Sequence, residues 1–261
     1  MIARIAALSL FIGAAFGQTS AQVAFTANSP RPLWDVVRQL EHQYGWRITY
    51  EDPPYESPLD LDNTVAPAYL ATHPGAAFLA PRPQPFTANI AGSVPSHYAA
   101  AGDAGATGLI QSAIDAVVAQ ATINGTKGFR VVHDGDFSHV TPTQYRKKDD
   151  TLAPLTPVLD TLVTLAPARR SVEDAVNLVC TQVAATRGIP IADGVVLTNL
   201  YHRVELTYAD HEPARVVLSR ILEDTNAERV SDGAPALRIT WDLLYDANEK
   251  SYFLSTHAIL Q

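Results

Sequence analysis

Apolar residues recur at the three- and four-residue spacing of an amphipathic helix in four segments of the chain. In the first segment, Leu33 and Val37 share one side, and Gly45 can adopt the left-handed conformation that ends a helix. At the start of the third segment, Ser171 and Asp174 have the spacing of an N-terminal capping box. We therefore predict four helices, at residues 32–44, 108–121, 172–187 and 213–223.

Alternating apolar and polar residues, which are typical of half-buried strands, lie between and after these helices. Directly after the first helix, Trp46, Ile48 and Tyr50 alternate with Arg47 and Thr49. The helix thus passes straight into a strand. The predicted strands are residues 46–50, 129–133, 137–143, 161–165, 203–209, 237–245 and 251–259.

The order of these elements repeats along the chain. Each half can be written strand, helix, strand, strand, helix, strand, strand, and each would bury one face of a small sheet under two helices. We predict an α+β fold of two such modules, the first module (residues 22–150) and the second module (residues 159–261). A linker at residues 151–158 contains Pro154 and Pro157, which disfavour a continuous element.

A long insertion, residues 53–106, interrupts the first module. It is rich in Pro, Ala and Gly, and a loop of this length without structure is unusual in a compact domain. We expect one or two short strands in it, with residues 85–90 as the best candidate, or alternatively a mobile flap.

The N-terminal residues have the layout of a cleavable signal peptide. Arg4 precedes an apolar run, residues 5–16, that is shorter than the roughly 20 residues of a membrane-spanning helix. Small residues follow, and we expect cleavage after Ala21, with Gly17 as a second candidate. We therefore interpret residues 1–21 as a signal peptide and expect a periplasmic or secreted protein with no transmembrane segment after cleavage.

The expected mature chain is acidic. Without residues 1–21 it has 18 basic and 27 acidic side chains, a net charge of −9. Nucleic acid is not an expected partner, because phosphate binding requires a basic face. Cys180 is the sole cysteine, so no internal disulfide can form, and its place on the apolar side of a helix favours a packed thiol.

Two segments carry a resemblance to a known family. Residues 23–50 read VAFTANSPRPLWDVVRQLEHQYGWRITY, and residues 204–221 read VELTYADHEPARVVLSRI. This pattern of strand, helix after a Pro-Leu pair, glycine and aromatic strand resembles the short N-terminal domain of secretins and TonB-dependent transducers. The resemblance implies a non-enzymatic recognition module that binds partner proteins or substrates in the periplasm, here in tandem.

Two groups of polar residues could support metal chemistry. The segment HDGDFSH offers His133, Asp134, Asp136 and His139 as nitrogen and oxygen ligands. Asp134-Gly135 is also a favoured hairpin turn, and the histidines would lie on strands whose faces alternate, so a shared metal ion does not follow from the spacing. The second group is an acidic stretch that could bind a hard cation but lacks the ligand spacing and central glycine of a calcium loop, so a solvated loop is the favoured interpretation: Glu51, Asp52, Glu56, Asp60 and Asp62.

Two functional hypotheses follow, and the sequence favours the non-enzymatic one. In the first, the protein binds or scaffolds a protein, peptide or glycan partner in the envelope through Tyr50, Tyr55 and Tyr69, taken as exposed aromatics. In the second, it is a metal-dependent hydrolase that combines residues 133–139 with the acidic loop after Tyr50. No catalytic nucleophile motif and no cofactor is indicated.

Overall fold

The computed structural model describes residues 22–91, 104–123 and 128–259 of the chain. The predicted signal peptide lies outside these residues. The described part contains helices and strands in alternation, which confirms the α+β class. Within the described ranges, no helix is long and apolar enough to cross a membrane.

The first module contains the predicted order of elements. Its strands and helices are β1 (Gln22–Ser29), α1 (Pro32–Tyr44), β2 (Arg47–Glu51), β5 (Gln84–Ala91), α3 (Ala104–Ile123), β6 (Phe129–Asp134) and β7 (Phe137–Pro142). The second module repeats this order with one additional short helix. Its elements are β10 (Leu162–Ser171), α4 (Val172–Arg187), β11 (Ile191–Asp193), α5 (Thr198–Tyr201), β12 (Val204–Pro213), α6 (Ala214–Ser231), β13 (Arg238–Asp246) and β14 (Ser251–Ile259).

The two modules share one six-stranded sheet, in the order β11-β14-β13-β2-β7-β6. Three strands come from each module, and β13 of the second module pairs in parallel with β2 of the first. The sequence pattern did not predict this junction, because alternation within a strand says nothing about its neighbours. Each module also has a separate two-stranded ribbon, β1-β5 or β10-β12.

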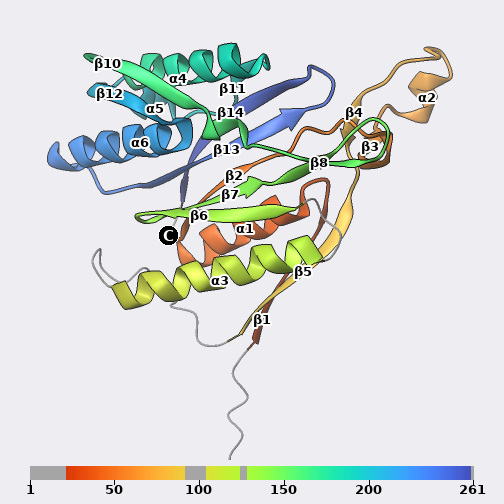
Figure 1. The fold of residues 1–261 in the computed structure, drawn as a ribbon, viewed down its shortest axis with the longest axis horizontal. Coiled ribbons are helices and arrows are strands. Elements are labelled where there is room, and N and C mark those ends of the chain that lie inside the picture. Colours follow the sequence, from red (N-terminus) through yellow and green to blue (C-terminus); the bar gives the residue numbers. More distant parts are fainter. Residues whose placement is uncertain (1–21, 92–103, 124–127, 260–261) are drawn as a thin grey trace, which may run out of the picture.

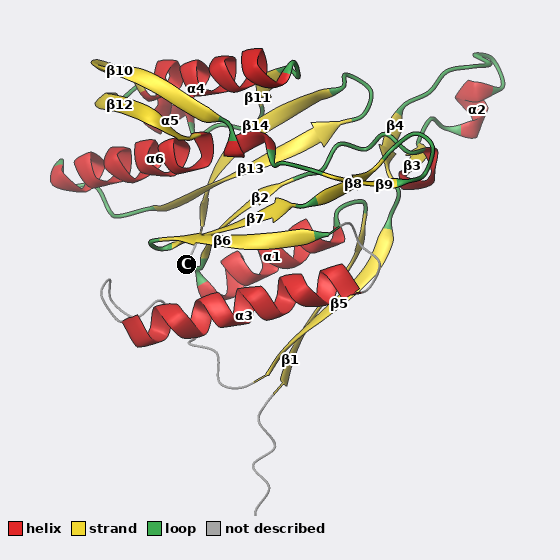
Figure 2. Ribbon diagram, viewed as in Figure 1, coloured by secondary structure: helices red, strands yellow, loops and turns green. Residues whose placement is uncertain are grey.

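The helices of the two modules lie on opposite faces of this sheet. Figure 1 shows α4 and α6 on one side of the sheet and α1 and α3 on the other, and Figure 2 shows the same layers by secondary structure. Each pair of helices packs on its own module's strands and forms a separate apolar core. Trp46, Ile48 and Tyr50 belong to the first core, and Trp241 and Leu243 belong to the second.

Local signals explain where the helices begin and end. Gly45 and Gly188 follow α1 and α4 with φ angles of 69° and 67°, the left-handed conformation that glycine adopts without strain. The Ser171 hydroxyl accepts a hydrogen bond from the backbone N–H of Asp174, as the capping spacing predicted. Two elements are longer than predicted: β10 continues to Ser171 and α6 continues to Ser231.

The predicted insertion and linker are both partly structured. The candidate strand at residues 85–90 is confirmed as β5. The segment before it, residues 53–83, projects from the sheet and is called the arm; it contains η1 (Pro58–Asp60), β3 (Leu61–Asn63), α2 (Pro67–Leu70) and β4 (Leu79–Pro81). In the linker, β9 (Leu152–Pro154) pairs with β8 (Gln144–Arg146), and η2 (Val158–Asp160) follows. Pro154 is tolerated because it stands at the end of a two-stranded pair.

Candidate functional site

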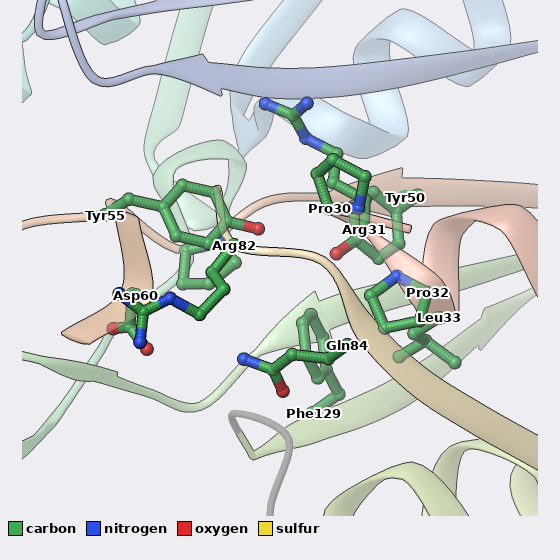
Figure 3. Close-up of a pocket in the computed structure, with 11 residues that line it drawn as sticks. Pro30, Arg31, Pro32, Leu33, Tyr50, Tyr55, Asp60, Arg82, Gln84 and Phe129 are labelled. Carbon is green, nitrogen blue, oxygen red and sulfur yellow. The ribbon is translucent and has the colours of Figure 1, made fainter. Parts of the chain in front are cut away.

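A small pocket lies where α1 begins, β2 ends, and β5 and β6 begin. Figure 3 shows Tyr55 at the left and Tyr50 at the right, with Gln84 and Phe129 below them. The pocket's cavity volume is about 40 Å³. The pocket therefore fits a single side chain or a group of that size, and it is far smaller than the clefts of about 300 Å³ or more that enclose drug-sized ligands.

The floor and walls of the pocket are mainly apolar. Tyr50 is buried, and its ring stacks on Phe129 of β6 at a centroid distance of 5.7 Å. Proline rings contribute apolar surface that is held rigidly, because the proline backbone has little freedom. The remaining apolar lining consists of Pro30, Pro32, Leu33 and Pro53.

A buried carboxylate fixes the wall behind the tyrosines. The Asp52 side chain accepts hydrogen bonds from Nε of Arg31 at 2.5 Å and from the Tyr55 hydroxyl at 3.1 Å. Its Oδ2 also accepts the backbone N–H of Tyr245 on β13, at 3.0 Å. The Arg31 guanidinium turns away from the pocket and donates to the Tyr245 carbonyl at 2.8 Å. Asp52 thus ties the pocket wall to the second module.

The two pocket tyrosines are neutral phenols at physiological pH. Burial, together with the negative charge of Asp52, raises the pKa of both Tyr50 and Tyr55 well above the ordinary value. A phenol can donate one hydrogen bond and accept another. The pocket therefore offers polar hydroxyls within an apolar surface.

The rim of the pocket is polar and more exposed. The Arg82 side chain is 45 % exposed and donates to Asp62 at 2.8 Å. The Gln84 amide points into the opening between Arg82 and Phe129. Asp60 completes the lining and lies 3.7 Å from the Arg146 guanidinium. An arginine and an amide at the mouth suit carbonyl or carboxylate oxygens of a bound chain.

The structure brings two of the three predicted binding tyrosines together. Tyr50 and Tyr55 both line the pocket, although Tyr50 is buried and not exposed as expected. Tyr69 lies on α2 in the arm, where it is 52 % exposed and stacks on His73 at a centroid distance of 4.0 Å. Tyr69 does not line this pocket.

The predicted metal ligands of the β6–β7 hairpin do not converge. His133 pairs across the hairpin with Ser138, whereas His139 pairs with Val132, so the two imidazoles lie on opposite faces of the sheet. His133 hydrogen-bonds with Ser138 and with Asp115 of α3, at 3.0 and 3.2 Å. Asp134 and Asp136 lie at the exposed turn. In the described ranges, no three His, Cys, Asp or Glu side chains are placed to hold a metal ion.

His139 is a packed residue of the sheet interior. Its Nδ1 lies 2.8 Å from the Thr49 hydroxyl, and its ring stacks between Phe137 and Trp241, 5.8 Å from each ring centroid. Burial, with a smaller contribution from Arg215, lowers its pKa to about 3. At neutral pH the imidazole is therefore uncharged.

The acidic stretch after Tyr50 is only partly the solvated loop that the sequence suggested. Glu51 and Asp52 are fully buried, while Glu56 and Asp62 remain at least partly exposed. Glu51 accepts the backbone N–H groups of Val158 and Leu159, and burial raises its pKa to about 7. These carboxylates have structural partners, and the burial reflects the junction with the second module.

Sequence reasoning missed most of the pocket. Arg82, Gln84 and Phe129 come from three places in the chain, and only the folded topology brings them to Tyr50. The pair of prolines around Arg31 was a usable signal, since it fixes the direction of the chain entering α1. Comparison of the chain with family models, curated proteins and solved structures finds no match, so the chemistry of the site rests on its own geometry.

Proposed function

We propose that this protein is a non-enzymatic binding protein that takes one side chain of a peptide or protein partner into the pocket between Tyr50, Tyr55 and Phe129. The observation that carries this proposal is the pocket itself: a small apolar recess with hydroxyls inside and an arginine and an amide at its mouth. Such a recess fits the anchor residue of a polypeptide, whose backbone would lie over the rim.

A polypeptide suits the pocket better than a glycan does. Sugar rings typically stack on the open face of an aromatic side chain, and the Tyr50 face is covered by Phe129. Only the Tyr69 ring on the arm is widely exposed among the three predicted tyrosines, and His73 already stacks on one of its faces. The arm could add contacts to a bound chain, because Phe78 on it is 58 % exposed.

The proposal agrees with two expectations from the sequence. An exported protein with residues 1–21 as signal peptide would meet its partner in the periplasm or outside the cell. The resemblance to the N-terminal domain of secretins and TonB-dependent transducers implies recognition without catalysis. The hydrolase hypothesis receives no comparable support, because His133 and His139 lie on opposite faces of the sheet.

A substitution that fills the pocket tests this proposal. Random peptides displayed on phage are selected on the purified protein, and the dissociation constants of the selected peptides are then measured for variants. Gln84→Trp places a large ring at the mouth and is expected to weaken binding at least about tenfold, or about 1.4 kcal/mol.

Thr87→Trp is the matched control, because Thr87 lies on the same strand with its side chain exposed on the outer face. It should leave the dissociation constants unchanged. The proposal is contradicted if no peptide binds above background, or if Gln84→Trp binds the selected peptides as tightly as the unsubstituted protein.

A further inference from the structure

The two modules are structural repeats with position-by-position equivalence. Counting from the helix-ending glycines, Gly45 and Gly188, places Tyr50 of β2 at the position of Asp193 on β11. Each module ends in a β-hairpin, and the first strand of that hairpin ends at Asp134 in β6 or at Asp246 in β13. Counting back from these two residues aligns β6 with β13. This second count places Arg130 of β6 at the position of Asp242 on β13.

The strand registers support both counts independently. Arg47 of β2 pairs with Phe137 of β7, and Ile191 of β11 pairs with Tyr252 of β14. Counting from the glycines makes Ile191 the equivalent of Ile48, and Ile48 pairs with Ser138. The hairpins give the same answer, since Ser138 and Tyr252 both stand one residue after the first residue of the returning strand.

The relation between the modules is open-ended. In each module the first sheet strand is parallel to the last, and the strand before the last is antiparallel to it. Because β13 is parallel to β2, the three strands of one module run opposite to their equivalents in the other, and the helices cover opposite faces. One module is brought onto the other by a rotation of 180° about an axis that lies in the sheet and runs perpendicular to the strands, followed by a translation of three strands along the same axis. Such an operation does not return to its starting point, so it can continue through further modules.

The two outer strands of the sheet are the equivalents of the two strands at the junction. Among the described strands, β6 and β11 each pair with one neighbour only. β6 is equivalent to β13, β11 is equivalent to β2, and the two outer strands run in the same direction. A second copy of the chain could therefore add its β11 to β6 in parallel, by the operation that joins the modules within one copy. Exposed sheet edges of this kind are templates for pairing.

The outer strands carry complementary charges at the joining position. At the internal junction, Asp242 stands opposite Tyr50. The equivalent pair between copies would be Arg130 of β6 and Asp193 of β11. The Arg130 side chain is 49 % exposed and donates to Asp160 at 2.8 Å, and Asp193 is exposed. A guanidinium has five N–H donors, so Arg130 can contact a second carboxylate without losing Asp160.

The helices leave room for continuation. Six strands at a spacing of about 4.8 Å span about 29 Å, whereas the two helices on one face occupy about 20 Å together. The helices alone therefore leave about one helix width uncovered on each face for every copy. Repetition of the internal operation does not force helices of adjacent copies into the same space.

We infer that copies of this protein associate head to tail, with β6 of one copy pairing in parallel with β11 of the next and Arg130 meeting Asp193 across the joint. The contact is heterologous, so one copy contributes β6 and the other contributes β11. It does not involve the interior of the tyrosine pocket, and it can hold or fail independently of peptide binding.

Pairwise disulfide trapping tests the head-to-tail contact. The single-cysteine variants Arg130→Cys and Asp193→Cys are prepared in a Cys180→Val background, in which the buried native thiol is replaced by the residue found at the equivalent position, Val37. Adjacent strands bring paired Cα atoms within the roughly 4.4–6.8 Å that a disulfide spans. On mild oxidation, the mixture of the two variants is expected to form a heterodimer several-fold faster than either variant forms a homodimer.

Thr87→Cys provides a control for random collision, because Thr87 is exposed on the β1-β5 ribbon, which is not part of the six-stranded sheet. Its mixture with Asp193→Cys should cross-link at the background rate. A heterodimer yield at that background, or an equal yield of Arg130 homodimers, would overturn the inference.

Sedimentation velocity of the unsubstituted protein gives a second test that needs no cysteine variant. The mean sedimentation coefficient is expected to rise over a roughly hundredfold range of concentration. Asp193→Arg, which places like charges opposite each other, should reduce the rise, and the double variant Arg130→Asp with Asp193→Arg should restore it. A single monomeric species across the whole range would overturn the inference.

Discussion

The end of β2 and the end of β11 occupy the same place in the two repeats, yet their environments are opposite. Tyr50, Glu51 and Asp52 are buried in the first module, whereas the equivalent residues, Asp193, Gly194 and Val195, are exposed in the second. The difference follows from the neighbouring strand, because β13 lies beside β2 and no described strand lies on the outer side of β11. Burial at a repeat position is thus set by what pairs with it.

This difference concentrates polar chemistry in the first module. A neighbouring strand supplies the backbone N–H and C=O groups of Tyr245 that hold Asp52 and Arg31 in place. At the outer edge, the backbone of Val195 donates to Ser255 of its own module. The tyrosine pocket therefore stands where two repeats meet, and the second module has no equivalent of Asp52 with which to build one.

Removal of the Asp52 carboxylate should give the largest effect. Asp52→Ala leaves the partly buried Arg31 guanidinium without its partner, and loss of one member of a buried ion pair typically costs about 3–5 kcal/mol. The free energy of unfolding, measured by denaturant titration, is expected to fall by that amount. Val195→Ala is the matched substitution at the equivalent position, which is 74 % exposed, and it should change stability by less than about 0.5 kcal/mol. Similar losses in the two variants would contradict the comparison.

The second prediction concerns a buried carboxyl at the same junction. Asp242 lies on β13 at the position equivalent to the exposed Arg130, and burial raises its pKa to about 6. It faces Arg38 and Glu41 of α1, and its Oδ2 is 3.7 Å from Nδ1 of His257. An unfolded aspartate has a pKa near 3.9. Asp242 therefore holds its proton more tightly in the folded protein than in the unfolded chain.

The sign of the pH effect follows from that order of pKa values. The contribution of Asp242 is fully present below about pH 4 and is lost as the pH rises through about 6. Asp242→Asn cannot ionise, so the stability of the unsubstituted protein relative to this variant should fall by on the order of 3 kcal/mol between pH 4 and 7. Denaturant titrations of both proteins at several pH values measure the difference.

An exposed carboxyl provides the control for this prediction. Asp149 accepts hydrogen bonds from Thr151, which lower its pKa below the ordinary value. Asp149→Asn should therefore show no loss of relative stability for the unsubstituted protein as the pH rises from 4 to 7. A flat difference for Asp242→Asn would mean that this carboxyl ionises as easily in the folded protein as in the unfolded chain.

The smallest effect is expected at a core position that the repeats share. Cys180 of α4 is equivalent to Val37 of α1, and both side chains are buried. Cys180→Val should change the free energy of unfolding by less than about 1.5 kcal/mol, because the apolar side chain is of similar volume. A larger loss, measured by thermal or denaturant unfolding, would show that the two helices do not pack equivalently.

Much of the fold could be predicted from local patterns. The apolar spacing around Leu33 and Val37 and the glycine at position 45 gave a helix that the structure confirms, and the capping residues before α4 were also recognised. The junction of β13 with β2 could not be predicted, because strand alternation specifies a buried face and leaves the neighbouring strand open.

The candidate site was predicted less well. Tyr50 and Tyr55 were selected as exposed aromatics, but the junction buries Tyr50, and proximity in sequence did not bring Tyr69 to the pocket. The residue types of the segment HDGDFSH suggested a metal site, but His133 pairs across the turn with Ser138, the neighbour of His139, so the two histidines lie on opposite faces of the sheet. Whether two side chains on paired strands share a face depends on the register of the strands, which is seen only in the folded sheet.

Hydrogen exchange of the backbone amides tests the continuous sheet most directly. At a protein concentration low enough to keep copies apart, interior strands should exchange more slowly than edge strands. The account predicts that the paired amides of β2 and β13 exchange as slowly as those of β7, and that β6 and β11 exchange faster. If β2 and β13 exchanged as fast as β6 and β11, the two modules would not share a sheet, and both the origin of the pocket and the head-to-tail contact would have to be abandoned.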